Sequence, residues 1–269
     1  MIRSALVLDF DGVISDSAVE SFLVALRTYV KLRPHSPLAK HDAPLRESTL
    51  AAIRLDPLFL DFLEMMPLGN RAEDFGVVLS LLEDGLRAED QLGYDRARSG
   101  QPVDFLEAFH AQFYEERAAL QRMDQDIWAS WIEPYEPLVR CLRAPGSEKA
   151  LCIATAKDRP SVEILLDRYG LTGVFLPDRV IDKEHGRSKR AHLSALRERL
   201  GLEFSDLTFV DDKFNHLEDV APLGVRCVLA AWGYNGQREQ VLAQQAGYRV
   251  CPVDQIPECL FESEGDRVV

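Results

Sequence analysis

The stretch ALVLDFDG, residues 5–12, is a short apolar run that ends in two aspartates and a glycine. A nearly continuous apolar run of this length is typical of a strand that is covered on both faces of a sheet. Asp9 and Asp11 are two positions apart, so on an extended chain their side chains point to the same side. Two carboxylates at one point repel each other unless a cation or a proton separates them. The stretch therefore predicts a central strand with a ligand site at its carboxyl end.

Further short apolar runs follow, with helix-spaced apolar residues between them. We predict strands at Leu151–Ala154, Arg179–Ile181, Leu207–Val210 and Val225–Ala230. We predict helices at Ser161–Tyr169, Lys189–Leu200 and Phe214–Leu223, each of which stops at a glycine. Strands that alternate with helices of this length form βαβ units. The sequence therefore predicts an α/β fold whose core is a doubly wound, Rossmann-like parallel sheet.

One long interval interrupts this alternation, between the first and second predicted strands. It contains successive helical patterns at Ser17–Leu32, Leu45–Glu64, Ala72–Leu92, Val103–Arg122 and Asp126–Ile132. A single helix is enough to connect two parallel strands, so the additional helices form an inserted, all-helical domain. We expect residues 16–133 to form this domain, and residues 1–15 together with residues 134–269 to form the α/β core.

Composition and charge exclude several classes of protein. The chain has 269 residues, of which 46% are hydrophobic and 28% charged, as is ordinary for a soluble globular protein. Its formal net charge of −13 disfavours nucleic acids and anionic membranes as partners. No apolar run approaches the length of a membrane span, and the N-terminus lacks the hydrophobic segment of a secretory signal. The five cysteines form no CxxC pair. We therefore expect a cytoplasmic protein with reduced thiols. The sequence does not indicate an oligomeric state.

A second acidic pair follows another predicted strand. Leu207–Val210 runs directly into Asp211 and Asp212. In an open parallel sheet, ligands bind outside the carboxyl ends of the strands, so both acidic pairs are expected at one edge. Clustered carboxylates give a buried strand no structural advantage, and their repulsion costs stability without a cation. Oxygen ligands of this kind suit Mg²⁺, which we therefore expect as the cofactor.

Two further positions supply groups that bind anions. Thr155 ends the second predicted strand, and a helix begins shortly after it. A hydroxyl, backbone N–H groups and a helix N-terminus together make an anion site. The alternative is that Thr155 or Asp158 only caps that helix. Lys189 lies in the basic run RSKR, residues 187–190, for which a solvated surface is the alternative.

In this order, the motifs resemble those of the haloacid dehalogenase superfamily, and the resemblance spans the whole predicted core. Residues 9–12, DFDG, match the family's first motif, and Thr155 matches the second. Lys189 matches the third motif, with Lys183 as the alternative, and residues 211–212 match the fourth. The helical insertion lies where the family places a cap between its first and second motifs.

The resemblance implies phosphoryl transfer in two steps. Asp9 would attack phosphorus and become an aspartyl phosphate, and Asp11 would protonate the leaving alcohol and later deprotonate water. Family members that attack carbon lack the second aspartate, so Asp11 favours phosphoryl transfer. Thr155, Ala156 and Lys189 would bind the phosphoryl oxygens.

The resemblance also implies a metal site and a class of substrate. Mg²⁺ would be held by Asp9, the backbone carbonyl of Asp11 and Asp212, while Asp211 would act through water or by orienting Lys189. The implied function is a magnesium-dependent phosphatase that acts on a small phosphomonoester.

Three other functions stay open. A sugar-phosphate mutase would return the phosphoryl group to its substrate. A phosphonate hydrolase would need a Schiff-base lysine from the cap, for which Lys31 and Lys40 are the candidates. A catalytically silent binding protein would keep the fold without turnover. Three more residues have two interpretations each: His216 lines the site or lies on the surface, and Arg71 and Arg98 contact an anionic substrate or lie in solvated turns.

Overall fold

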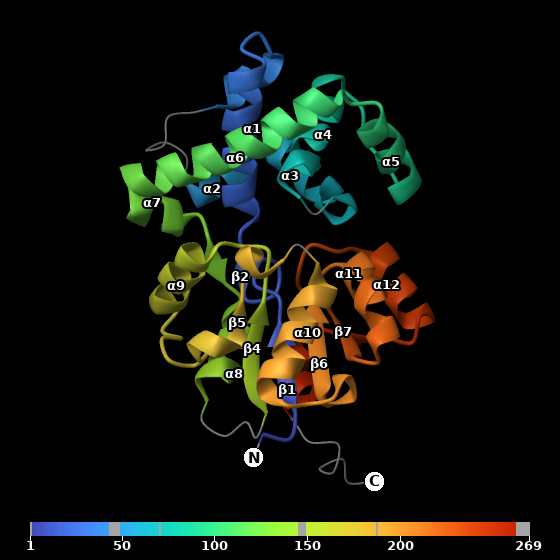
Figure 1. The fold of residues 1–269 in the computed structure, drawn as a ribbon. Helices are drawn as coiled ribbons and strands as arrows, with labels where there is room; N and C mark the ends of the chain where they lie inside the picture. Colours follow the sequence, from blue (N-terminus) through green and yellow to red (C-terminus); the bar gives the residue numbers. More distant parts are fainter. Residues whose placement is uncertain (1, 43–48, 70, 145–148, 187, 262–269) are drawn as a thin grey trace. The chain divides into compact units, whose positions relative to one another are not determined.

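The computed structural model describes residues 2–42, 49–69, 71–144, 149–186 and 188–261. The chain forms two compact units, which Figure 1 shows as ribbons. Met1–Asp16 and Pro134–Val269 form one of them, here called the α/β unit, and Ser17–Glu133 form the other, the helical unit. Two short strands, β2 (Ser15–Asp16) and β3 (Glu133–Pro134), pair with each other where the chain passes from one unit to the other.

In its described residues, the α/β unit is built on a six-stranded parallel sheet, in the order β5-β4-β1-β6-β7-β8. Its strands are β1 (Ala5–Leu8), β4 (Ala150–Ala154), β5 (Val180–Ile181), β6 (Leu207–Asp211), β7 (Arg226–Ala230) and β8 (Arg249–Cys251). The chain extends the sheet to one side of β1 with β4 and β5, and then to the other side with β6, β7 and β8. The predicted doubly wound α/β fold is confirmed.

The helices of the α/β unit cover a sheet that is buried on both faces. They are α8 (Glu136–Arg143), α9 (Arg159–Arg168), α10 (Lys189–Leu200), α11 (Phe214–Val220) and α12 (Gln237–Gln245). Ala5 and Val7 of β1 pack with apolar residues of α10, α11 and α12 in one core cluster. Leu6 and Leu8, which point to the opposite face, are also fully buried. This two-sided burial explains the continuous apolar run in the sequence.

The register of the sheet positions the candidate site. Leu8 at the end of β1 aligns with Ile153 of β4 and with Val210 of β6. The Asp9 N–H continues the pattern by donating to the Val210 carbonyl at 2.9 Å. Residues that follow these three strands therefore leave the sheet at a common edge.

The helical unit contains seven α-helices within its described residues. They are α1 (Ala18–Leu32), α2 (Leu50–Arg54), α3 (Pro57–Met65), α4 (Ala72–Glu83), α5 (Gln91–Ser99), α6 (Val103–Met123) and α7 (Gln125–Ser130). Among the residues that the structure describes, no helix combines the length and the apolar character needed to cross a membrane.

Two predicted helices of this unit are wrong in extent, because each is broken. The predicted Leu45–Glu64 breaks at Asp56, which is extended and caps α3, since Pro57 disfavours a helical conformation in the residue before it. The start of that prediction, residues 45–48, lies outside the described residues. The predicted Ala72–Leu92 breaks after α4, where Gly85 adopts a positive φ of 69° and its N–H donates to the Leu82 carbonyl.

A buried ion pair joins three helices of the helical unit. Glu20 of α1 is fully buried and accepts hydrogen bonds of 2.7 and 2.8 Å from the guanidinium of Arg117 on α6. It also accepts a hydrogen bond of 3.0 Å from the indole N–H of Trp128 on α7. Each polar atom of this cluster would be costly to bury alone, so the three side chains depend on one another.

Candidate active site

Lys189 connects the carboxyl ends of three neighbouring strands. Its Nζ lies 2.8 Å from Asp9 Oδ1, after β1, and 3.3 Å from Asp211 Oδ2, at the end of β6. It also donates to the carbonyl of Ala154, the last residue of β4, at 2.8 Å. Ser188 caps α10, and Lys189 is the first residue of that helix, which directs its side chain to the sheet edge. The structure therefore brings Asp9, Asp211 and Lys189 into one network.

Burial and the lysine determine the charges of this network. Burial raises the pKa of Asp9 to about 6, against the attraction of Lys189. Burial also acts to raise the pKa of Asp211, but His216 and Lys189 more than offset it and hold that pKa below its usual range. The pKa of Lys189 is raised, because the two carboxylates outweigh the effect of its burial. At neutral pH the network is therefore two carboxylates around an ammonium group.

Asp212 lies beside this network and has different partners. Its side chain is buried, and Oδ2 accepts the backbone N–H of Tyr234 at 2.8 Å. Burial raises the pKa of Asp212 to about 7, with Lys213 opposing the shift and Asp211 adding to it. Gly12 has a φ of 84°, and a Cβ on it would lie 2.4 Å from Asp212 Oδ2. The glycine of the DFDG motif is thus required by the close approach of this carboxylate.

The donor set of these residues fits a divalent metal ion. Asp9, Asp211 and Asp212 are each at most 7% exposed, so three carboxyl groups share a site with little water. Asp9, Asp211 and His216 offer ligand atoms that lie within 4.8 Å of one another. Burial is the main cause of the raised pKa values of Asp9 and Asp212, and a bound cation would favour the charged form of both. Oxygen donors of this kind suit Mg²⁺.

Asp11 makes an ion pair with a lysine that the motifs do not predict. Lys157 Nζ lies 2.9 Å from Asp11 Oδ1 and 3.3 Å from Oδ2. The Lys157 side chain is fully buried, whereas the Asp11 side chain is 32% exposed. A cation beside the predicted proton donor is therefore part of the site. Its sequence signal is a lysine two positions after Thr155, at the tip of a strand.

The turn after β4 bears on whether Thr155 binds an anion or only caps the following helix. Asp158, not Thr155, caps α9, because its Oδ1 accepts the N–H of Ser161 at 2.9 Å. Thr155 Oγ1 accepts the N–H of Lys157 at 3.0 Å, which leaves the hydroxyl proton available for a further acceptor. Ala156 is exposed in the same turn. These positions are compatible with phosphate binding, which stays a prediction.

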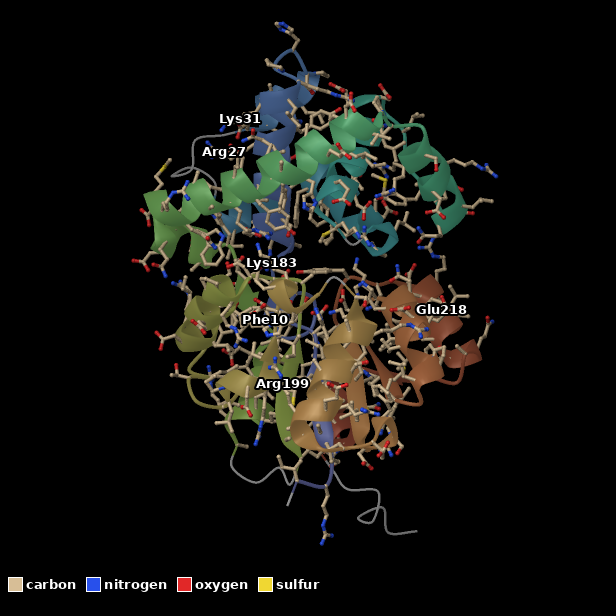
Figure 2. The ribbon with its side chains drawn as sticks, in the orientation of Figure 1. Phe10, Arg27, Lys31, Lys183, Arg199 and Glu218 are labelled. Atoms are coloured by element: carbon tan, nitrogen blue, oxygen red, sulfur yellow. The ribbon has the colours of Figure 1, made fainter. Side chains whose placement is uncertain are left out.

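His216 and the two candidate lysines can also be placed. His216 Nδ1 lies 3.0 and 3.1 Å from the two oxygens of Asp211, so this histidine belongs to the site's polar network. Lys189 makes the ion pairs with Asp9 and Asp211, whereas Lys183 lies in a short helical turn, Lys183–His185. Phe10, which stands between Asp9 and Asp11 in the sequence and is labelled in Figure 2, is fully buried.

Three of the four basic residues singled out in the helical unit make ion pairs within that unit. Lys31, labelled on α1 in Figure 2, pairs with Glu116 of α6. Arg98 Nε lies 2.9 Å from Asp74 Oδ1. Arg71 is 61% exposed, with its guanidinium 4.0 Å from Glu73. Lys40 is exposed in a short helical turn.

Comparisons with known proteins give matches among solved structures. No family model and no curated protein matches the chain. A candidate phosphoglycolate phosphatase from Lactobacillus delbrueckii subsp. bulgaricus has a TM-score of 0.63 and 14% identity, over 98% of this chain and 100% of that chain. A predicted phosphoglycolate phosphatase from Haemophilus somnus has a TM-score of 0.58 and 16% identity, over 96% of this chain and 98% of that chain. A haloacid dehalogenase-like hydrolase from Streptococcus pneumoniae has a TM-score of 0.59 and 12% identity, over 95% and 97% of the two chains.

The chain has the haloacid dehalogenase-like fold. The resemblance read from the four motifs is thereby confirmed at the level of the fold. The residues of those motifs lie at the carboxyl edge of the sheet, after β1, β4 and β6 and at the start of α10. That edge is where open α/β sheets bind ligands.

Proposed function

We propose that the chain is a magnesium-dependent phosphohydrolase that cleaves small phosphomonoesters through an aspartyl phosphate on Asp9. The observation that carries this proposal is the position of Lys189, 2.8 Å from Asp9 and 3.3 Å from Asp211. A buried carboxylate that a lysine keeps charged is a competent nucleophile toward phosphorus. The names of matching structures, which include phosphatases and a hydrolase, support a reaction of this class.

In the first step, a carboxylate oxygen of Asp9 forms a bond to phosphorus while the bond from phosphorus to the alcohol oxygen breaks. The leaving oxygen takes a proton from the carboxyl group of Asp11. Lys189 and the hydroxyl of Thr155 donate hydrogen bonds to the phosphoryl oxygens and stabilise the developing charge. The products of this step are the free alcohol and the aspartyl phosphate.

In the second step, a water molecule attacks phosphorus and gives its proton to the Asp11 carboxylate. The bond from phosphorus to Asp9 breaks, which releases phosphate and restores the carboxylate. Lys157, whose Nζ lies 2.9 Å from Asp11, would stabilise the carboxylate that Asp11 becomes after the first step and that acts as the base in the second.

Bound Mg²⁺ would neutralise the repulsion between the attacking carboxylate and the phosphoryl group. We assign the side chains of Asp9 and Asp212 and the backbone carbonyl of Asp11 to it. Asp211 is hydrogen-bonded to His216 and paired with Lys189, which supports an orienting role for this carboxylate. We further infer that the helical unit, inserted between β1 and β4, is the cap that selects the substrate.

A phosphate-release screen over small phosphomonoesters, with and without Mg²⁺, tests this function. We expect turnover of at least one ester by the wild-type protein, dependent on Mg²⁺, and its loss in Asp9→Asn, because an amide cannot form the acyl phosphate. Asp126→Asn is the matched control, since Asp126 is an exposed aspartate of the chain's other Asp-x-Asp sequence. Full turnover by Asp9→Asn with an unchanged circular dichroism spectrum would exclude Asp9 as the nucleophile.

A further inference from the structure

The loop after β7 makes a set of contacts to the site that no motif predicts. β7 ends at Ala230, and residues 231–235, AWGYN, connect it to α12. Tyr234 is only 8% exposed although it lies in a loop. Loops are usually more open, so burial of a tyrosine here indicates a defined structural role.

This loop donates hydrogen bonds to two oxygen atoms of Asp212. The N–H of Tyr234 donates to Asp212 Oδ2 at 2.8 Å. The side-chain amide of Asn235 donates to the backbone carbonyl of Asp212 at 3.1 Å and to that of Ala230 at 2.8 Å. Both the carboxylate and the backbone of the predicted metal ligand are therefore fixed by neighbouring loop residues.

The same loop also holds the turn that follows the first motif. The indole N–H of Trp232 donates to the carbonyl of Val13 at 3.0 Å. The hydroxyl of Tyr234 donates to Asp16 Oδ1 at 3.1 Å. Val13 and Asp16 belong to a turn that the Gly12 N–H closes on the Ser15 carbonyl at 2.8 Å. Tyr234 thus bonds to Asp212 through its backbone and to this turn through its side chain.

Gly233 brings the three segments together. A Cβ on Gly233 would lie 2.3 Å from Asp212 Cβ and 2.3 Å from the Gly12 carbonyl oxygen. Real Cβ atoms do not approach other atoms so closely, so any side chain at this position would push the loop away from Asp212 and Gly12. Gly236, three residues later, has space: its Cβ would find its nearest neighbour, Glu239 Oε2, at 3.5 Å.

We propose that Trp232–Asn235 is a positioning element that sets Asp212 for metal binding and couples metal binding to the order of the turn Gly12–Asp16. The inference rests on the proposed function in one respect, namely that Asp212 is a ligand of Mg²⁺. Coupling of this kind is reciprocal, so bound metal should stabilise the turn to the same degree that an ordered turn strengthens metal binding.

The first test compares the Mg²⁺ affinity of Gly233→Ala and Gly236→Ala by isothermal titration calorimetry. We expect Gly233→Ala to bind Mg²⁺ at least about tenfold more weakly than wild type, as is usual when the partners of a metal ligand are displaced. Gly236→Ala should stay within about twofold, because its methyl group meets no close neighbour. Equal affinity of a folded Gly233→Ala and the wild type would overturn the proposal.

The second test uses substitutions that keep an aromatic side chain and remove one hydrogen-bond donor. It can therefore be carried out even if Gly233→Ala does not fold. Hydrogen exchange of the amides of residues 12–16 is measured with and without Mg²⁺ in wild type, Trp232→Phe and Tyr234→Phe. We expect Mg²⁺ to slow this exchange in the wild type. In both variants, the protection that Mg²⁺ gives should be at most half of the wild-type value. Equal protection by Mg²⁺ in all three proteins would overturn the coupling.

The two proposals fail in different ways. If the wild-type protein binds no Mg²⁺ in the calorimeter, the metal assignment of the proposed function is wrong, and the positioning role falls with it. If the wild type binds Mg²⁺ and requires it for turnover, while the folded Gly233→Ala variant binds it equally well, only the positioning role is wrong.

Discussion

At the scale of single residues, Lys189 carries the charge balance of the site. Its ammonium group pairs with both Asp9 and Asp211, at 2.8 and 3.3 Å. Removal of its ammonium group would leave two buried carboxylates facing each other, which opposes the approach of a phosphate ester. The alternative lysine, Lys183, lies in the short helical turn directly after β5 and provides a comparison.

We expect Lys189→Met to lower kcat/KM by about 10²–10³-fold, the usual effect of removing one group that stabilises transition-state charge. Lys183→Met should retain activity within about threefold, since Lys189 is the lysine that makes the ion pairs with Asp9 and Asp211. Steady-state kinetics on the best ester from the screen measure both values. The reverse order of the two variants would assign the motif to Lys183.

His192 gives a pH dependence of stability that is separate from the site carboxylates. It is 2% exposed, its Nε2 bonds to the Gly186 carbonyl at 2.8 Å, and its Nδ1 has no hydrogen-bond partner among the described residues. Burial lowers the pKa of His192 from 6.5 to about 4. The nearby charges of Lys189 and His185 add to this shift, and the charge of Asp182 opposes it.

The sign of this effect follows from proton uptake. Below pH 6.5 the unfolded chain binds a proton that the folded His192 does not, so the stability contribution is lost as the pH falls toward 4. Between about pH 7.5 and 5 we expect the wild type to lose about 2 kcal/mol more stability than His192→Gln. Urea unfolding of both proteins at the two pH values measures the difference. Parallel losses would show that His192 is not a buried neutral base.

At the scale of elements, α10 shows what local sequence can predict. Its bounds, Lys189–Leu200, coincide with those expected from the sequence, because Ser188 caps it and Gly201 ends it in a left-handed conformation. β8, in contrast, is not predicted. It has three residues at the edge of the sheet and, among the described strands, pairs only with β7, so its sequence needs no continuous apolar run.

The buried cluster of the helical unit allows a prediction about how α1, α6 and α7 depend on one another. Arg117→Met leaves the carboxylate of Glu20 buried without its cation, and should lower the free energy of unfolding by about 3–5 kcal/mol. Adding Glu20→Gln should recover part of that loss, because the uncompensated charge is then gone. Urea unfolding of the single and double variants measures both. If the double variant is less stable than Arg117→Met, charge compensation is not what the pair provides.

At the scale of the whole molecule, the fold was predictable because the same sequence pattern occurs several times along the chain. Apolar strands that end in polar groups recur along the chain, and each alternates with a helix, so errors in single elements do not change the class of fold. The roles of Asp9 and Asp11 remain predictions that the geometry supports.

Contacts between distant parts of the chain could not be predicted in this way. Lys157 and Asp11 are 146 residues apart, and Trp232 and Val13 are 219 residues apart. Neither pair follows a periodic pattern, because only the order of strands in the sheet brings these segments together. Sequence spacing identifies groups that leave neighbouring strands, and the residues that hold those groups in place become visible only in three dimensions.

The covalent intermediate on Asp9 is the central claim, and trapping it is the most direct test. The protein is mixed with Mg²⁺ and p-nitrophenyl phosphate, quenched in acid within the first turnover, and digested for peptide mass spectrometry. We expect one phosphoryl group on the peptide that contains Asp9, and none in Asp9→Asn. Release of p-nitrophenol with no phosphoryl group on the protein, or with the group on another residue, would contradict the account.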